Sequence, residues 1–137
     1  MTTAIEKCLA QWHQLMSTKN TEILQTLIAD DAVFISPVVH TPQVGKPITM
    51  AYLTAASQTL GNPSFRYIDE VIGDNRAVLE FTVELDGKEV NGVDLIRCNS
   101  EGQIIEFKVM VRPLKGMNAV HDAMGAALQK MADQTQS

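Results

Sequence analysis

The sequence predicts an α+β domain in which helices come first and an antiparallel sheet follows. Apolar residues recur every three or four positions in much of residues 3–60, which is the period of a helix. In residues 65–111 they alternate with polar residues instead, which is the period of a strand. Helices must close one side of a curved sheet before it can enclose a cavity. We therefore expect a cone-shaped half-barrel of curved antiparallel sheet, closed by the N-terminal helices and followed by an additional C-terminal helix.

The first two helices follow from the spacing of apolar residues. Residues 3–18 place one apolar stripe on a single helical face, formed by Ile5, Cys8, Leu9, Trp12, Leu15 and Met16. Asn20 or Thr21 then caps a short second helix. The apolar face of that helix consists of Ile23, Leu24, Leu27 and Ile28.

A short strand and a third helix complete the N-terminal half. Residues 32–36 are rich in strand formers, and Pro37 stops the strand because it has no backbone N–H to donate. Pro47 suits the first turn of a helix, where a missing N–H costs nothing. We expect this third helix to end near Leu60, before Gly61-Asn62-Pro63.

The C-terminal half reads as strands and one helix. A strand begins near Phe65, and residues 79–85 alternate clearly between apolar and polar. Asp86-Gly87 is a hairpin signal that leads into the strand holding Asp94. The chain turns again at residues 99–102 into a strand with Ile105, Phe107, Val109 and Val111 on one face. Pro113 ends that strand, and residues 114–133 form the last helix, whose apolar side includes Met117, Val120, Met124, Leu128 and Met131.

The length, charge and composition of the chain exclude several classes of function. The chain of 137 residues has no repeat or linker and is read as a single domain, 1–137. Its net charge is −5 and its basic residues are scattered, which argues against a nucleic-acid surface. No apolar stretch is long enough to span a membrane, and no signal peptide is evident, so we expect a cytoplasmic protein. Neither the cysteines nor the histidines have metal-ligand spacing, and we expect no metal and no cofactor. These residues are Cys8, Cys98, His13, His40 and His121.

Asp94 is the most informative residue. It lies in the middle of an apolar strand, Gly92-Val93-Asp94-Leu95-Ile96-Arg97-Cys98. A buried carboxylate must find partners or give up its charge, because an unpaired buried ion is costly. Two interpretations remain at this point. Asp94 either belongs to a functional site, or lies at the rim of the sheet, solvated or paired with a neighbour such as Arg97.

Several motifs resemble those of the nuclear-transport-factor-two-like superfamily, and of its SnoaL-like proteins in particular. The similar segments are Ala29-Asp30-Asp31-Ala32 with Ser36-Pro37, the Gly45-Lys46 helix start, and Asp94-Leu95-Ile96-Arg97 followed by Asn99 and Gly102-Gln103-Ile104. The last of these resembles a hairpin of bacterial ketosteroid isomerases. The resemblance is strongest over residues 8–112 and implies the cone-shaped fold.

The isomerase pattern is retained at only one position. The resemblance puts the isomerase tyrosine at Trp12, its catalytic base at Ser36 and its second aspartate at Asp94. In the isomerases this second aspartate stays protonated in an apolar site and donates a hydrogen bond. Trp12 can donate a hydrogen bond but has no proton that titrates near neutral pH, and Ser36 has no identifiable base to activate it. We therefore do not expect steroid isomerisation by the usual mechanism.

The candidate site combines these residues. Asp94 is the expected pocket acid, and His40, in a loop that could rim the pocket, is the spare base. The expected substrate-binding residues are Trp12, Ser36, Phe81, Val83, Ile96, Phe107, Val109 and Val111. Trp12 can equally be a core residue, Ser36 a turn residue and His40 a solvated histidine. The C-terminal methionines fit a core, a dimer face or a cavity mouth.

Two function classes remain open. The chain is either an isomerase-, dehydratase- or cyclase-like enzyme acting on a small apolar oxygenated molecule (steroid, terpenoid or polyketide-like), or a non-catalytic small-molecule-binding or dimerisation domain. The retained acid favours the enzyme, and the missing base and tyrosine favour the binding domain. We also expect a homodimer, because sheets in this fold usually have an apolar outer face to cover.

Overall fold

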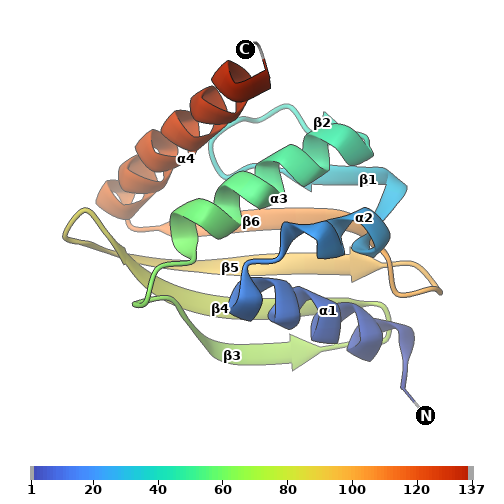
Figure 1. Cartoon of the computed structure of the whole chain (residues 1–137). Coiled ribbons are helices and arrows are strands. Elements are labelled where there is room, and N and C mark those ends of the chain that lie inside the picture. The colour runs from blue at the N-terminus through green and yellow to red at the C-terminus, as the bar shows by residue number, and fades with distance from the viewer. Residues whose placement is uncertain (1, 136–137) are drawn as a thin grey trace.

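Six strands form one curved, open sheet, and all the helices lie over one of its faces (Figure 1). The computed structural model describes residues 2–135. The helical elements are α1 (Ala4–Thr18), the 3₁₀ turn η1 (Thr21–Ile23), α2 (Leu24–Leu27), α3 (Lys46–Leu60) and α4 (Leu114–Thr135). The strands are β1 (Ile28–Ile35), β2 (Gln43–Val44), β3 (Arg66–Ile72), β4 (Arg76–Leu85), β5 (Lys88–Cys98) and β6 (Ile104–Arg112).

The strand order is β2-β1-β6-β5-β4-β3. Strands β3 to β6 form an antiparallel meander, which matches the predicted sheet. Strand β1, however, runs parallel to β6, so the sheet is mixed at that side. The α+β class, the curved sheet and the additional C-terminal helix are confirmed.

Local signals explain where the helices begin. Thr3 caps α1 by accepting a hydrogen bond from the backbone N–H of Glu6 at 3.2 Å. Asn20 caps η1 in the same way through Glu22. Gly45 precedes α3 with φ of 112°, a conformation that favours glycine. These helices agree with the sequence prediction.

Two details of the prediction were wrong. Ile28 begins β1 instead of ending the second helix, because it pairs with Ile104 on β6 and its side chain is fully buried there. At the start of β6 the register shifts by one residue, so that Cys98 pairs with Ile104 and Arg97 with Glu106. As a result Ile104, and not Ile105, turns fully into the core, while Phe107 keeps its predicted inward position.

Two apolar clusters fill the concave side of the sheet. The larger cluster lies between α1, α2, α3 and the sheet, and includes Trp12, Phe34 and Phe107. The smaller cluster lies under the start of α4 and includes Phe81, with Ala119 and Val120 from α4 itself. Figure 1 shows α4 crossing the open end of the concave face beside α3. Within residues 2–135, no helix is both long and apolar enough to cross a membrane.

Candidate functional site

Asp94 points into the concave side of the sheet and is 5% exposed. Its neighbours Val93 and Leu95 face the opposite side, as strand alternation requires. Among the buried residues of the described chain, Asp94 is the only one with a carboxyl group. The rim interpretation is therefore wrong: this carboxyl group lies inside the domain and is not paired with Arg97.

Tyr67 is the hydrogen-bond partner of Asp94. The Tyr67 hydroxyl donates to Asp94 Oδ2 at 2.6 Å, and Trp12 Nε1 donates to the Tyr67 oxygen at 2.8 Å. The three side chains come from β3, β5 and α1, so the chain of hydrogen bonds joins a helix to two strands of the sheet. Since no other partner of Asp94 is found among residues 2–135, and Asp94 lines a cavity, Oδ1 is left for a ligand or solvent.

Cross-strand packing brings Tyr67 to Asp94. Tyr67 pairs with Phe81 on β4, and Phe81 pairs with Gly92 on β5, two residues before Asp94 on the same face. A Cβ atom at Gly92 would lie 2.5 Å from Phe81 Cζ, so only glycine lets the Phe81 ring lie over β5. The Tyr67 ring stands edge-on to Phe81, with centroids 6.4 Å apart. This arrangement leaves room for the phenol to cross β4 and reach the carboxyl group.

His13 and Glu70 form a contact beside Tyr67. His13 Nε2 lies 2.6 Å from Glu70 Oε1, which links α1 to β3 beside Tyr67. The His13 ring also meets the Tyr67 ring edge-on, with centroids 5.4 Å apart. Both contacts help to fix the orientation of the phenol.

The environment changes the acidity of both groups. Burial raises the pKa of Asp94 from 3.8 to about 7, and the hydrogen bond from Tyr67 opposes the rise. Burial, followed by the nearby charge of Asp94, raises the pKa of Tyr67 well above its usual value. Tyr67 therefore remains a donor at neutral pH, whereas Asp94 exists in both acid and carboxylate forms.

Two adjoining cavities lie along the concave face. The inner chamber, beside Asp94, has a volume of about 20 Å³, and its walls include Trp12, Phe65 and Phe107. The outer pocket, under α4, has a volume of about 190 Å³. The two cavities share four apolar lining residues, Phe34, Ala56, Leu60 and Val109. The two cavities therefore adjoin along these four side chains, and we refer to the pair together as the passage between α4 and the carboxyl group.

The structure brings together part of the predicted site. Trp12, Asp94, Phe107 and Val109 all line the inner chamber. Ser36 lines the outer pocket together with Val109. The Trp12 ring forms part of the chamber wall, but its N–H is used by Tyr67 and does not serve a ligand.

Other predicted residues lie elsewhere. His40 is exposed in the segment between β1 and β2 and lines neither cavity. Ile96 belongs to the larger apolar cluster, whereas Phe81, Val83 and Val111 belong to or pack on the smaller one. Strand alternation had grouped such residues on one face of each strand, and the structure shows that this face is the concave one. Helix α4 and the side chain of Phe65 pack against that smaller cluster, so these residues support the walls of the cavities and do not line them.

Sequence reasoning missed Tyr67 and the residues of α4. Tyr67 was placed in a strand, but nothing in its spacing relates it to Asp94, which lies two strands away in the sheet. His121 and Met124 both line the outer pocket. The methionine stripe had indicated a cavity mouth as one of three options, and Met124 fits that option.

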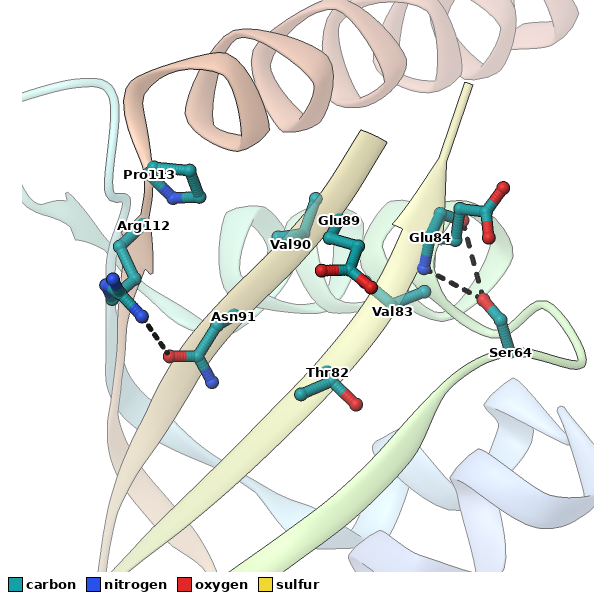
Figure 2. A pocket seen from close by; sticks show the side chains of 9 residues that line it. All are labelled: Ser64, Thr82, Val83, Glu84, Glu89, Val90, Asn91, Arg112 and Pro113. Carbon is teal, nitrogen blue, oxygen red and sulfur yellow. Dashed lines mark hydrogen bonds between the residues drawn. The ribbon is translucent and has the colours of Figure 1, made fainter. Parts of the chain in front are cut away.

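A third hollow lies on the outer face of the sheet. This outer groove has a volume of about 470 Å³ and is shown in Figure 2. Arg112 reaches Asn91 there at 3.5 Å, while Glu84 and Glu89 line the same groove (Figure 2). None of these four polar side chains is buried. The groove is therefore an exposed polar surface, whereas the inner chamber beside Asp94 is enclosed by mainly apolar side chains. Within residues 2–135, no three His, Cys, Asp or Glu side chains are placed to hold a metal ion.

Comparisons with known proteins agree with this fold. The model of the SnoaL-like domain matches residues 9–107. A steroid delta-isomerase from Pseudomonas aeruginosa is 31% identical, with a TM-score of 0.87 over 98% of this chain and 96% of the other. A protein with a cystatin-like fold from Silicibacter pomeroyi is 27% identical, with a TM-score of 0.83 over 94% and 90% of the two chains.

A third structure shares the fold alone. A putative SnoaL-like polyketide cyclase from Jannaschia sp. CCS1 is 13% identical, with a TM-score of 0.64 over 83% of this chain and 91% of the other. The comparison with functionally curated proteins gives no match.

The raised pKa of Asp94 predicts how stability depends on pH. The folded state binds the proton more tightly than the unfolded state, so this contribution to stability is complete below about pH 4 and is lost as the pH rises through about 7. Between pH 5 and 8 the free energy of unfolding should fall by roughly 3 kcal/mol relative to Asp94→Asn. Urea denaturation of both proteins measures this, and parallel pH profiles would contradict it.

Removing the phenol hydroxyl should raise the pKa of Asp94 further. In Tyr67→Phe the carboxylate loses the hydrogen bond that stabilises its charged form, so the carboxyl group should titrate above its wild-type value. Carboxyl ¹³C NMR of Asp94 measures the change. Tyr52→Phe is the matched control, because it removes a phenol hydroxyl group that makes no hydrogen bond to Asp94. An unchanged or lowered pKa in Tyr67→Phe would show that the hydrogen bond does not stabilise the carboxylate.

Proposed function

This chain belongs to the SnoaL-like domain family, and from that premise we propose that it is a cofactor-free, isomerase-, dehydratase- or cyclase-like enzyme acting on a small apolar molecule that carries an oxygen function. One observation carries the proposal. Asp94 is a buried carboxyl group at the end of an apolar passage, with a pKa raised to about 7 and one oxygen left for a ligand. Such a group is matched to proton transfer at neutral pH.

The protonation state of Asp94 determines what it can do. As a carboxylate, Oδ1 can remove a proton from a carbon next to a carbonyl group. As an acid, the same oxygen can donate a proton to a carbonyl, hydroxyl or leaving oxygen. Tyr67 keeps the carboxyl group oriented in both forms, since its own raised pKa keeps it a donor. One carboxyl group can thus take a proton from one atom of a substrate and return it to another.

The apolar walls supply binding energy. Trp12 and Phe107 pack with ring centroids 4.8 Å apart, and Phe34 stacks on Tyr52 at 4.9 Å. A ligand that reaches from the outer pocket to Asp94 would contact these rings. Burying apolar surface stabilises a complex by roughly 25 cal/mol per Å² before the costs of association.

A non-catalytic binding domain is the second candidate. It is favoured by one observation: Trp12 N–H and Tyr67 O–H are both used within the protein. Asp94 is the only carboxyl group lining either cavity of the described chain, and no second donor faces the ligand beside it to stabilise a developing oxyanion. A binding domain would hold an oxygenated ligand through Asp94 without changing it.

Proton exchange on a simple ketone separates the two candidates. The enzyme should accelerate exchange of the protons beside the carbonyl group of 2-tetralone in D₂O, with a rate that rises with pH through about 7 as Asp94 ionises. Asp94→Asn should reduce this rate about a hundredfold or more, because it removes the base. ¹H NMR follows the exchange, and Asp122→Asn, on the exposed face of α4, is the control. Binding of tetralone without faster exchange would support the binding domain.

We also propose a homodimer formed through the face of the sheet that carries no helix. Half-buried Val78, Val93 and Leu95 lie on this face, and Met110 is 53% exposed there. The outer groove carries Arg112 together with the acidic side chains of Glu84 and Glu89, and this presence of both charge signs supports pairing with a second copy. In a two-fold symmetric dimer, Arg112 of one protomer would face the acidic side chains of the other.

Charge reversal tests this dimer. Sedimentation velocity at micromolar concentration should show a dimer for the wild type, and Arg112→Glu should weaken it by about tenfold or more, since like charges would then face each other. Adding Glu89→Lys should restore part of the affinity. Lys130→Glu, on the exposed side of α4, makes the same charge change elsewhere and should have no effect. A wild-type monomer would refute the proposal.

A further inference from the structure

Ser36 follows β1, which lies two strands away from the strand of Asp94 in the same sheet. In the sheet, Asp94 pairs with Val109 on β6, and Ile35 on β1 pairs with Lys108. Ser36 is the next residue of the chain, so it is level with Val109. Neighbouring strands are about 4.8 Å apart, which places Ser36 and Asp94 roughly 10 Å from each other with Val109 between them.

The Ser36 hydroxyl is oriented by the backbone. Its oxygen accepts hydrogen bonds from the N–H groups of Val38 at 3.0 Å and Val39 at 3.3 Å. The hydroxyl hydrogen remains available for a hydrogen-bond acceptor in the outer pocket, which Ser36 lines. The far end of the passage therefore has a polar group of its own, held in place by the turn that follows β1.

Helix α4 adds a second polar group to the outer pocket. His121 lines the outer pocket with Ser36, although the two residues lie far apart in the sequence. The rest of the α4 surface in the pocket is apolar or lacks a side chain, being formed by Val120, Met124, Gly125 and Leu128. Asp94 thus lies in the inner chamber, Ser36, His121 and Tyr52 line the outer pocket, and the four residues that the two cavities share are apolar.

The size of the passage limits the ligand. The outer pocket and inner chamber, at about 190 and 20 Å³, are smaller than the roughly 300 Å³ at which pockets for drug-sized ligands begin. A rigid four-ring molecule would have to displace α4 from its contacts with α3 and β5. A molecule of two fused rings fits the volume of the outer pocket, and the inner chamber has room for a single oxygen group beside Asp94.

We propose that the ligand is a two-ring apolar molecule with an oxygen at each end, and that Ser36 and His121 bind the oxygen that lies away from Asp94. This inference rests on the proposed function for the role of Asp94 at the near end. It adds the substrate class and the residues that select it. Ser36 donates its hydroxyl hydrogen to the distal oxygen, and His121 makes the second hydrogen bond from α4.

Calorimetric titration with three probes tests the proposal. The probes are 2-naphthol, which has one oxygen, 2,6-dihydroxynaphthalene, which has one at each end, and the four-ring steroid androstenedione. The wild type should bind the diol about tenfold more tightly than 2-naphthol, because of the added hydrogen bonds, and more tightly than the steroid. Ser36→Ala should remove the preference for the diol and leave the affinity for 2-naphthol unchanged.

Two further variants distinguish the loss of a hydrogen bond from a loss of folding. Ser36→Thr keeps the hydroxyl group and should keep the preference for the diol. His121→Ala changes an exposed side chain and should weaken binding of the diol alone. Equal affinity of the wild type for the diol and 2-naphthol, tighter binding of the steroid, or no binding of either naphthalene would each overturn the inference.

The same titrations separate this inference from the proposed function. If Asp94→Asn changes no affinity and tetralone exchange stays at the background rate, but Ser36→Ala still removes the preference for the diol, the role of Asp94 fails and the distal contact stands. In the opposite case, Asp94→Asn binds both naphthalenes more weakly than the wild type does, but the wild type and Ser36→Ala bind the diol with equal affinity. The distal contact then fails and the role of Asp94 stands.

Discussion

The hydrogen bond from Tyr67 to Asp94 is the interaction on which the rest of the site depends. A carboxyl group at this depth would be strongly destabilising without a partner, and the 2.6 Å contact supplies one without neutralising the group. Trp12 completes the arrangement by donating to the same phenol oxygen. Because one hydrogen bond only partly offsets burial, Asp94 keeps a pKa of about 7 and remains able to exchange a proton.

Backbone geometry makes that hydrogen bond possible. Gly92 lets the Phe81 ring lie over β5, and the Tyr67 ring then crosses β4 to reach Asp94. A side chain at Gly92 would displace Phe81 and with it the phenol. The same cross-strand contacts thus determine how Phe81 and Tyr67 pack and what pKa Asp94 has. A substitution that changes this packing is expected to change the pKa of Asp94 as well.

Helix α4 supplies part of the wall of the outer pocket. The helix crosses the open end of the concave face (Figure 1). Its residues Val120, His121, Met124, Gly125 and Leu128 line the outer pocket. The size and polarity of the passage therefore depend on a helix that lies outside the residues matching the SnoaL-like domain, 9–107. Fold alone does not fix the ligand, whereas the side chains on this helix and after β1 narrow its class.

The sequence alone determined the α+β class and the order of elements, because helix and strand periods and turn residues are local properties. It singled out Asp94 but left open whether its side chain faces the core or the rim of the sheet. It also indicated Trp12, Phe107 and Val109 as wall residues. Only the tertiary structure decided that β1 runs parallel to β6, that Tyr67 is the partner of Asp94, and that Ser36 and His121 line one pocket closed by α4. These contacts join residues far apart in the chain, and their pairing depends on strand register and sheet curvature, which no local pattern encodes.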